Sequence, residues 1–306
     1  MMNEHWKVID GSWPEILHVQ GDNEARYPYS NALLVRTEKE GNSVLMIDCG
    51  IGARIARKLR KEFTVTRILL SHWHEDHTTS VKMMKGASIS CHPADIPALT
   101  DTTTFMRNYG VVGMPFEQEF TIFMDSIGME PVHGVEPLST DLFREGDASL
   151  QVIHAPGHSA GHCCFYEPGR KIAFLSDIDL SKFGPWYGCS DSSLDAFIQS
   201  IRTLQAIDID VAVTSHEAMK EGKAIKDGLD YFLKKIEERN DKILGMLHER
   251  SPLLASDIYG HNLVYRNYDK FGDYLRHAEA IMVDHHLRYL LGAGKITRSG
   301  DGYMLS

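Results

Sequence analysis

Residues 72–77 read His72-Trp73-His74-Glu75-Asp76-His77, and this hexapeptide is the strongest signal in the chain. Its clustered imidazoles would repel one another if protonated, and its carboxylates would be costly to bury without partners. A divalent cation removes both problems, because neutral imidazole and carboxylate are its usual ligands in proteins. His72 and His74 can point to one metal ion, and Asp76 and His77, after a turn, can point to a second. The alternative is an exposed polar turn, because short motifs also arise by chance.

Short apolar runs rich in β-branched residues recur along the first two thirds of the chain, each of about strand length. Between them, residues 53–63 and 194–206 place apolar side chains on one helical face. This alternation predicts an α/β fold. The expected strands are Ala32–Val35, Val44–Ile47, Arg67–Leu70, Ala87–Ser90, Leu150–Ile153, Cys163–Tyr166, Ile172–Leu175 and Asp210–Val213.

Further candidate ligands stand just beyond the carboxyl ends of these strands. They are Asp48, His72, His158, Asp177 and His216. Strands end rigidly while the following loops can present side chains, so these residues are expected to meet at one edge. Asp177 has two carboxylate oxygens and can bridge two cations. His162, four positions after His158, is expected to support the site or to lie in the core.

The order HxHxDH, then Gly-His, then Asp, then His resembles the metallo-β-lactamase superfamily, in particular its hydrolytic branch similar to glyoxalase II. The resemblance covers about residues 15–217 and implies an αββα sandwich with a dinuclear metal site along one edge. It implies that His72, His74 and His158 hold the first metal. It further implies that Asp76, His77 and His216 hold the second, with Asp177 bridging the two.

The same resemblance gives Asp48 a structural role, braced against the metal loop. Two departures leave the subfamily and the substrate open. Ser176 precedes Asp177, and Ser215 precedes His216, where the family commonly has glycine. Neither departure removes a ligand.

Composition and charge limit the classes of protein to which this chain can belong. The chain has 306 residues, a formal net charge of −10 and five cysteines without a CxxC pair. Scattered cysteines in odd number are typical of reduced thiols, so we expect a cytoplasmic protein. No stretch has the length of a signal peptide core or a membrane span, and the negative charge disfavours polyanionic partners. The serine-hydrolase motif GxSxG is also absent.

We expect two domains, a catalytic domain over residues 1–225 and a C-terminal helical domain over residues 226–306. Residues 93–146 form an insert rich in Met and Phe, which either lines the substrate pocket as a lid or packs its own small core. The C-terminal domain is expected to contain three short helices, over residues 226–248, 257–259 and 274–291, and a hairpin over residues 295–305, which is a winged-helix-like pattern. That pattern resembles the appendage of β-lactamase-like hydrolases that include mitochondrial single-strand endoribonucleases.

The charge of the C-terminal domain bears on that second resemblance. Within residues 251–306, six cations stand against six acids, so the basic stripe that binds phosphates is missing. We therefore expect a module for packing or homodimerisation rather than for nucleic acid. The cations are Arg266, Lys270, Arg276, Arg288, Lys295 and Arg298, and the acids are Asp257, Asp269, Asp273, Glu279, Asp284 and Asp301.

The function predicted from these features is a dinuclear hydrolase. A metal-bridging hydroxide would attack the carbonyl of an ester, thioester or lactone, with Asp76 and Asp177 as catalytic residues. Two zinc ions are expected, with iron as an alternative that the same ligands accept. The substrate is expected to be a small molecule with an apolar acyl group, against which residues 183–187 could form a wall. The alternatives are a metal-dependent phosphodiesterase or endoribonuclease and an iron-dependent oxidoreductase.

Overall fold

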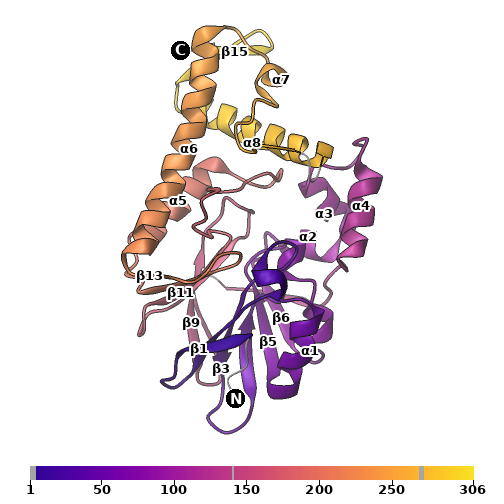
Figure 1. The fold of residues 1–306 in the computed structure, drawn as a ribbon, viewed down its shortest axis with the longest axis vertical. Helices are drawn as coiled ribbons and strands as arrows, with labels where there is room; N and C mark the ends of the chain where they lie inside the picture. The colour runs from indigo at the N-terminus through magenta and orange to yellow at the C-terminus, as the bar shows by residue number, and fades with distance from the viewer. Residues whose placement is uncertain (1–4, 140, 269–271) are drawn as a thin grey trace.

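A computed structural model of the protein describes residues 5–139, 141–268 and 272–306. Parts of three predicted regions lie outside the described residues: residues 1–4 of the catalytic domain, residue 140 of the insert and residues 269–271 of the C-terminal domain. The described chain forms two large sheets with helices on their outer faces, and a two-stranded sheet near the C-terminus (Figure 1).

The first sheet has seven strands in sequence order. Strands β1 to β4 are antiparallel, and β4 to β7 are parallel. The parallel part requires crossovers, and helix α1 (Ala53–Glu62) makes the one between β4 and β5. The strands are β1 (Trp6–Asp10), β2 (Ile16–Val19), β3 (Ala32–Arg36), β4 (Ser43–Ile47), β5 (Thr64–Leu70), β6 (Ser88–Cys91) and β7 (Val135–Pro137).

The second sheet has six strands in the order β13-β12-β11-β10-β9-β8. Only the β11–β12 pair is parallel, and helix α5 (Leu194–Gln205) connects those two strands. The strands are β8 (Leu142–Glu145), β9 (Ala148–His154), β10 (Cys163–Glu167), β11 (Ile172–Ser176), β12 (Val211–Thr214) and β13 (Lys220–Glu221).

The apolar core has three layers, and this makes the fold an αββα sandwich. Side chains such as Leu33, Leu45 and Phe174 fill the space between the two sheets. On the outer face of the first sheet, α1 packs together with α2 (Ile96–Thr100), α3 (Thr102–Asn108) and α4 (Glu117–Ser126). On the outer face of the second sheet, α5 packs together with α6 (Lys223–Glu249). The predicted fold class is therefore confirmed.

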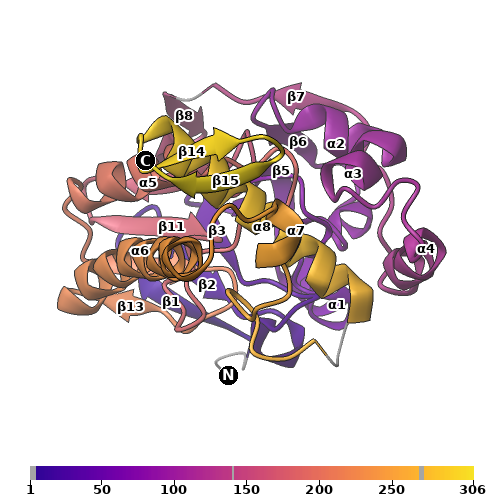
Figure 2. The ribbon, with the colours of Figure 1, turned by 90° about the horizontal axis from the view of Figure 1, so that it is seen from above.

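The three predicted C-terminal helices are present within three residues of their predicted bounds, but two of them are long rather than short. Helix α6 has 27 residues and α8 (Gly272–Gly292) has 21, and only α7 (Ala255–Ile258) is short. A hairpin of β14 (Ile296–Ser299) and β15 (Gly302–Leu305) ends the chain, as expected. The first half of α6 packs on the sandwich and its second half packs on α8 and the hairpin (Figures 1 and 2). The boundary at residue 225 and the winged-helix likeness stay predictions.

All eight predicted strands are present, and five were missed. The missed strands are β1, β2, β7, β8 and β13, which are short or carry exposed side chains. Four of them lie at sheet edges, and β2 is a buried interior strand of four residues; strands this short show little hydrophobic periodicity, so the sequence signal for them is weak. All five cysteines are buried and without disulfide partners. Within the described ranges, no helix combines the length and the apolarity needed to cross a membrane.

Candidate metal centre

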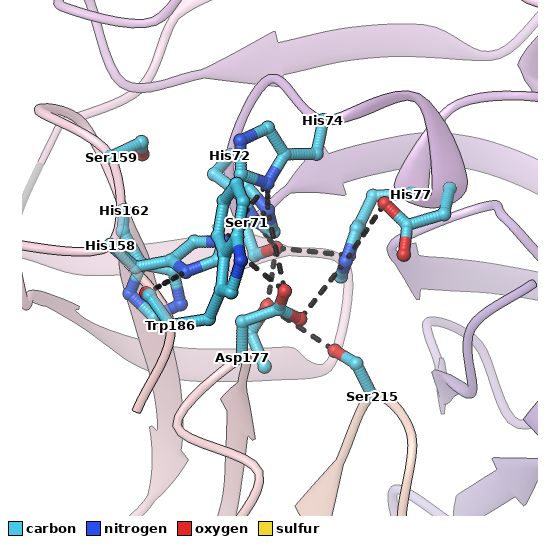
Figure 3. A network of polar contacts seen from close by, with 12 residues as sticks. Ser71, His72, His74, His77, His158, Ser159, His162, Asp177, Trp186 and Ser215 are labelled. Carbon is cyan, nitrogen blue, oxygen red and sulfur yellow. Dashed lines mark hydrogen bonds and ion pairs between the residues drawn. The ribbon is translucent and has the colours of Figure 1, made fainter. Parts of the chain in front are cut away.

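The structure brings three imidazole nitrogens together at one end of the sandwich (Figure 3). His74 Nδ1 lies 2.9 Å from His72 Nε2 and 2.9 Å from His158 Nε2, and the latter two are 3.2 Å apart. The ligands of a tetrahedral zinc ion, at roughly 2.1 Å from the metal, lie about 3.4 Å from one another. The three histidines come from the loops after β5 and β9, and all are buried. Their nitrogens therefore form a donor triangle of nearly the size that one cation requires.

A second group of donors lies beside the first. His216 Nε2 is 3.2 Å from Asp76 Oδ2, and His77 Nε2 is 3.8 Å from Asp76 Oδ1. Asp177 lies between the groups, with Oδ2 at 3.1 Å from His158 Nε2 and Oδ1 at 3.0 Å from His77 Nε2. All seven ligands suggested by the sequence thus converge, in the two predicted sets, with Asp177 facing both.

Two buried atoms at this centre have no hydrogen-bond partner among the described residues: His77 Nε2 and Asp177 Oδ1. They lie 3.0 Å apart, yet their geometry does not form a hydrogen bond. Buried polar atoms in proteins almost always have partners, so this pair is incomplete within the protein alone. A divalent cation would satisfy both atoms, and imidazole and carboxylate are ligands suited to it. The residues therefore fit a metal centre.

Each of the five histidines also has a partner for the ring nitrogen that points away from the centre. His77 Nδ1 donates to the Asp48 carboxylate at 2.7 Å, and His158 Nδ1 donates to the Trp186 carbonyl at 2.9 Å. His216 Nδ1 donates to the carbonyl of Ala25 at 2.9 Å. Such outer partners fix the tautomer and the ring orientation of a metal-ligating histidine. The remaining two contacts are His72 Nδ1 to Ser71 Oγ at 2.9 Å and His74 Nε2 to Cys189 Sγ at 3.5 Å.

Asp48 holds the 72–77 loop in place through hydrogen bonds to its carboxylate. Its carboxylate accepts hydrogen bonds from the Ser71 amide and the Ser71 hydroxyl, both at 2.7 Å, as well as from His77. Asp48 is fully buried, so these bonds are shielded from water. Next to it, a side chain at Gly50 would collide with the backbone carbonyl of Asp76. The segment Asp48–Gly50 therefore lets the metal loop pack directly on the end of β4.

The matching family model is the metallo-beta-lactamase superfamily, over residues 26–216. That range includes every candidate ligand and most of both sheets. The chain belongs to the metallo-β-lactamase superfamily. Its clustered His and Asp side chains offer donor atoms suited to divalent metal ions.

The curated relatives of this superfamily member include named thioesterases. An atrochrysone carboxyl ACP thioesterase of Paecilomyces divaricatus is 26% identical over 216 residues, 67% of this chain and 56% of that protein. Another, from Passalora fulva, is 25% identical over 298 residues, 92% of this chain and 77% of that protein. An uncharacterized protein of Aquifex aeolicus is 30% identical over 151 residues, 48% of this chain and 64% of that protein. The chain spans less than two thirds of the Aquifex and Paecilomyces proteins.

Solved structures support the same fold over nearly the whole chain. A β-lactamase domain protein from Burkholderia ambifaria aligns with a TM-score of 0.73 at 17% identity, covering 98% of this chain and 94% of that one. A metallo-beta-lactamase family protein from Thermus thermophilus aligns with a TM-score of 0.65 at 22% identity, covering 90% of this chain and 94% of that one. The fold shared with the Burkholderia protein therefore extends beyond the sandwich into the C-terminal helices.

The charges at the centre depend on whether a cation is bound. Burial lowers the pKa of His72 and of His74 well below 6.5, which favours the neutral form that binds metal. Burial also acts to lower the pKa of His216, but the carboxylates of Asp177 and Asp76 outweigh it and raise that pKa to about 10. In the metal-free protein, imidazolium at position 216 thus balances the carboxylates.

This charge balance predicts that metal binding releases protons. A group with a raised pKa, such as His216, is protonated at neutral pH without metal and must lose its proton to bind a cation. We expect about one or more protons released per protein at pH 7, and metal affinity that rises with pH up to about pH 10. Calorimetric zinc titrations in buffers of different ionisation enthalpy measure the release. Binding enthalpies that do not depend on the buffer would contradict this prediction.

His162 is near the centre but belongs to neither donor group. Its Nδ1 donates to the carbonyl of Ala155 at 3.1 Å, and its ring lies 5.3 Å from that of His72, centre to centre. Burial lowers the pKa of His162 to about 3, so the ring is neutral. The structure therefore places it behind the ligands, as expected from the sequence.

A pocket of about 750 Å³ opens over the donor groups. Its walls come from four parts of the chain: the loop that carries Tyr27, the 93–146 insert, the 179–186 segment and the C-terminal region. The 93–146 insert contributes both to the core and to the pocket wall. Phe105 and Met106 are buried in the core, while other side chains of the insert face the pocket. The aromatic lining residues are Tyr27, Tyr109, Phe116, Phe120, Phe123, Phe183, Trp186, Tyr265 and Tyr274. The pocket is thus largely aromatic above a polar floor.

Sequence reasoning missed the partners of Glu75, which is the buried spacer of the metal loop. Tyr27 and Tyr109 donate their hydroxyls to its two carboxylate oxygens, each at 2.6 Å. Burial and the neighbouring Asp76 raise the pKa of Glu75 to about 7. Nothing local marks the two tyrosines, because they lie 48 and 34 positions from Glu75.

Two carboxylates that hold the loop of His158, the buried Asp95 and the partly buried Asp191, were missed as well. Asp95 accepts from the Ser159 hydroxyl at 2.7 Å and from the amide of Gly161. Asp191 accepts from the Trp73 indole at 3.0 Å and from the Ala160 amide at 3.2 Å, and so ties the two metal-bearing loops together. The sequence signal for Asp191 is ambiguous, since an Asp followed by two serines also fits the start of the next helix.

Proposed function

We propose that this chain is a dinuclear metal-dependent hydrolase that cleaves a thioester, or a related ester or lactone, of an apolar acyl group. The observation that carries the proposal is the pair of donor groups sharing Asp177 at the floor of an aromatic pocket. The thioesterase names of two relatives support the choice of a thioester within this class.

In this proposal His72, His74, His158 and Asp177 hold one cation, and Asp76, His77, His216 and Asp177 hold the other. Two bound cations would supply hydroxide at neutral pH and polarise the acyl carbonyl. Zinc is the proposed native metal, and iron is the alternative for the same ligands. Metal analysis of protein isolated without added metal tests this: about two zinc ions per chain supports it, and stoichiometric iron with negligible zinc overturns it.

The protein's own side chains have three tasks in the reaction. Asp177 sets the position of the two donor groups relative to each other, because each of its carboxylate oxygens faces a different group. Asp76 lines the pocket and can take a proton from attacking water at a carboxylate oxygen. The aromatic walls exclude water and orient the acyl group, so that its carbonyl lies over the donor groups.

Electrostatics argue against a phosphodiester substrate. Among the described residues that line the pocket, three carboxylates besides the ligands are present, Glu119, Asp179 and Asp273, and no Lys or Arg. Recognition of a phosphate backbone depends on Lys and Arg contacts. An uncharged acyl group therefore suits the pocket better than a polyanion. Homodimerisation stays a prediction.

A substrate panel tests the proposed function. Metal-loaded protein is assayed against acyl thioesters, lactones, phosphodiesters and single-stranded RNA, with chelator-treated protein as the control. We expect metal-dependent hydrolysis of apolar acyl thioesters, and activity on phosphodiesters or RNA at background. Cleavage of RNA or phosphodiesters alone would overturn the proposal in favour of a nuclease.

The acyl pocket can be tested at Phe123. This half-buried side chain lines the pocket and stacks on Tyr27, with ring centres 6.1 Å apart. Phe123→Ala removes one wall without emptying the core, so KM for a long or aromatic acyl thioester should rise about tenfold with little change in kcat. Ile122→Ala is the matched control, since Ile122 is 60% exposed and does not line the pocket. Equal KM changes in both variants would contradict the placement of the acyl group.

A further inference from the structure

The segment 185–188 stands between the candidate metal ligands and the C-terminal helices. The carbonyl of Trp186 accepts a hydrogen bond from His158 Nδ1, and the sulfur of Cys189, just beyond the segment, contacts His74 Nε2. The same segment supplies Trp186 to the pocket wall. Whatever fixes the backbone of this segment therefore fixes the orientation of two ligand rings and one side of the pocket.

The backbone hydrogen bonds that the structure describes do not hold this segment in its conformation. Residues 185–188 have no regular secondary structure, and within the described chain no backbone–backbone hydrogen bond involves them. Buried peptide groups need partners, so side chains must provide them here. The carbonyl of Trp186 is satisfied by His158, and that of Pro185 by Arg239 of α6.

Arg239 makes an unusual set of contacts for a buried cation. It is 4% exposed, and among the described residues no carboxylate forms an ion pair with it. Its Nη1 donates to the Pro185 carbonyl at 2.7 Å and to the Tyr187 hydroxyl at 2.9 Å, and its Nη2 donates to the Phe183 carbonyl at 3.2 Å. The guanidinium also lies 5.7 Å and 5.5 Å from the ring centres of Phe183 and Tyr187. All of these contacts go to one five-residue stretch.

Helix α8 and the segment before it add two more contacts to the same stretch. Tyr187 Oη lies 2.7 Å from His286 Nε2, and Trp186 Nε1 donates to Tyr265 Oη at 2.6 Å. His286 is in turn held by Asn240 at 2.6 Å. Burial lowers the pKa of His286 to about 3, so a neutral ring, not a second cation, faces Arg239.

A buried charge is costly unless hydrogen bonds compensate it, and these carbonyls provide that compensation. For packing alone, an apolar side chain at position 239 would serve as well. The planar guanidinium of arginine, in contrast, presents its N–H donors in a fixed arrangement, so it can hold two carbonyls of an irregular segment in one geometry. We propose that Arg239 is a positioning residue for the metal ligand His158, acting through the backbone of residues 183–187. The C-terminal region thereby completes the metal centre.

The test measures metal affinity and needs no substrate, so it is independent of whether the proposed thioesterase activity is found. Zinc is titrated against a chromophoric chelator in the 306-residue chain carrying His216→Ala. This background disrupts the donor group of Asp76, His77 and His216 and leaves the group of His72, His74 and His158 intact. In that background, Arg239→Met should weaken zinc binding by about 10–100-fold, the usual effect of losing an outer partner. Arg239→Lys, which restores one donor, should recover part of the loss.

Ile243→Ala is the matched control for a purely structural role. Ile243 is one helical turn beyond Arg239 and is fully buried in the C-terminal core, a cluster that includes none of residues 183–187. It should lower the melting temperature of the metal-free protein while leaving zinc affinity unchanged. If Arg239→Met and Ile243→Ala weaken zinc binding equally, or if neither does, the positioning role is overturned.

A second variant covers the case in which Arg239→Met does not fold. Tyr187→Phe removes one hydroxyl that bonds both Arg239 and His286 and leaves the ring in place. We expect zinc affinity in the same background to fall several-fold, with little change in the melting temperature of the metal-free protein. Unchanged affinity in Tyr187→Phe would overturn the proposal.

Discussion

Replacement of Asp177 by asparagine is expected to lower kcat/KM by about 10³-fold or more, equivalent to roughly 4 kcal/mol of transition-state stabilisation. The reason is the double contact of this carboxylate, since its two oxygens face two different donor groups. Asparagine keeps the shape but loses the charge and one acceptor oxygen. We therefore expect both the activity and the metal content to fall, from about two ions per chain to one or fewer.

The control for this experiment is Asp195→Asn, an exposed carboxylate in the first turn of α5, away from the site. It should leave kcat/KM and metal content unchanged. Metal analysis and steady-state kinetics on the same preparations separate loss of metal from loss of chemistry. An Asp177→Asn protein that holds two ions and keeps full activity would refute both the bridging role and the catalytic role of Asp177.

Replacement of Asp48 by alanine should have the largest effect on stability. The change leaves three buried donors without an acceptor, the Ser71 amide, the Ser71 hydroxyl and His77 Nδ1. Each unsatisfied buried donor costs about 1–3 kcal/mol, so we expect a loss of roughly 3–5 kcal/mol in the free energy of unfolding. In thermal unfolding this corresponds to a melting temperature lower by about 10 °C.

Asp48→Ala should also weaken metal binding by about 10–100-fold, because His77 loses the partner that orients its ring. Asp210→Ala is the comparison, since this exposed acid precedes β12 and makes no contact with the metal loop. Its expected effect on stability is below about 0.5 kcal/mol. A melting temperature of Asp48→Ala within error of the unmodified protein would show that the brace under the 72–77 loop is not needed.

Most of the donor set could be read from the sequence because its signals are local. The spacing of His72, His74, Asp76 and His77 lies within six residues, and a loop of that length has few ways to present its side chains. The other ligands follow buried strands, whose apolar runs are visible as such. The strands that precede these residues, β4 and β5 in one sheet and β9, β11 and β12 in the other, run in the same direction within each sheet, so their carboxyl ends lie at one edge.

The supports of those ligands could not be read in the same way. His158 and His216 bond the main-chain carbonyls of Trp186 and Ala25, and every residue has a carbonyl, so composition carries no trace of them. Tyr27, Tyr109 and Asp191 reach the metal loop across 34 to 118 positions. The bounds of α6 and α8, in contrast, were predicted to within three residues, because helical periodicity is a local signal.

The sequence by itself determined an α/β fold and the seven candidate ligands, because periodicity and short spacing act over a few residues, and its resemblance to a known superfamily implied the sandwich. Only the tertiary structure decided which groups hold those ligands in place, how the insert and the C-terminal helices enclose the pocket, and why Arg239 lies buried. Those features depend on hydrogen bonds and contacts between distant segments, which form only when the chain has folded.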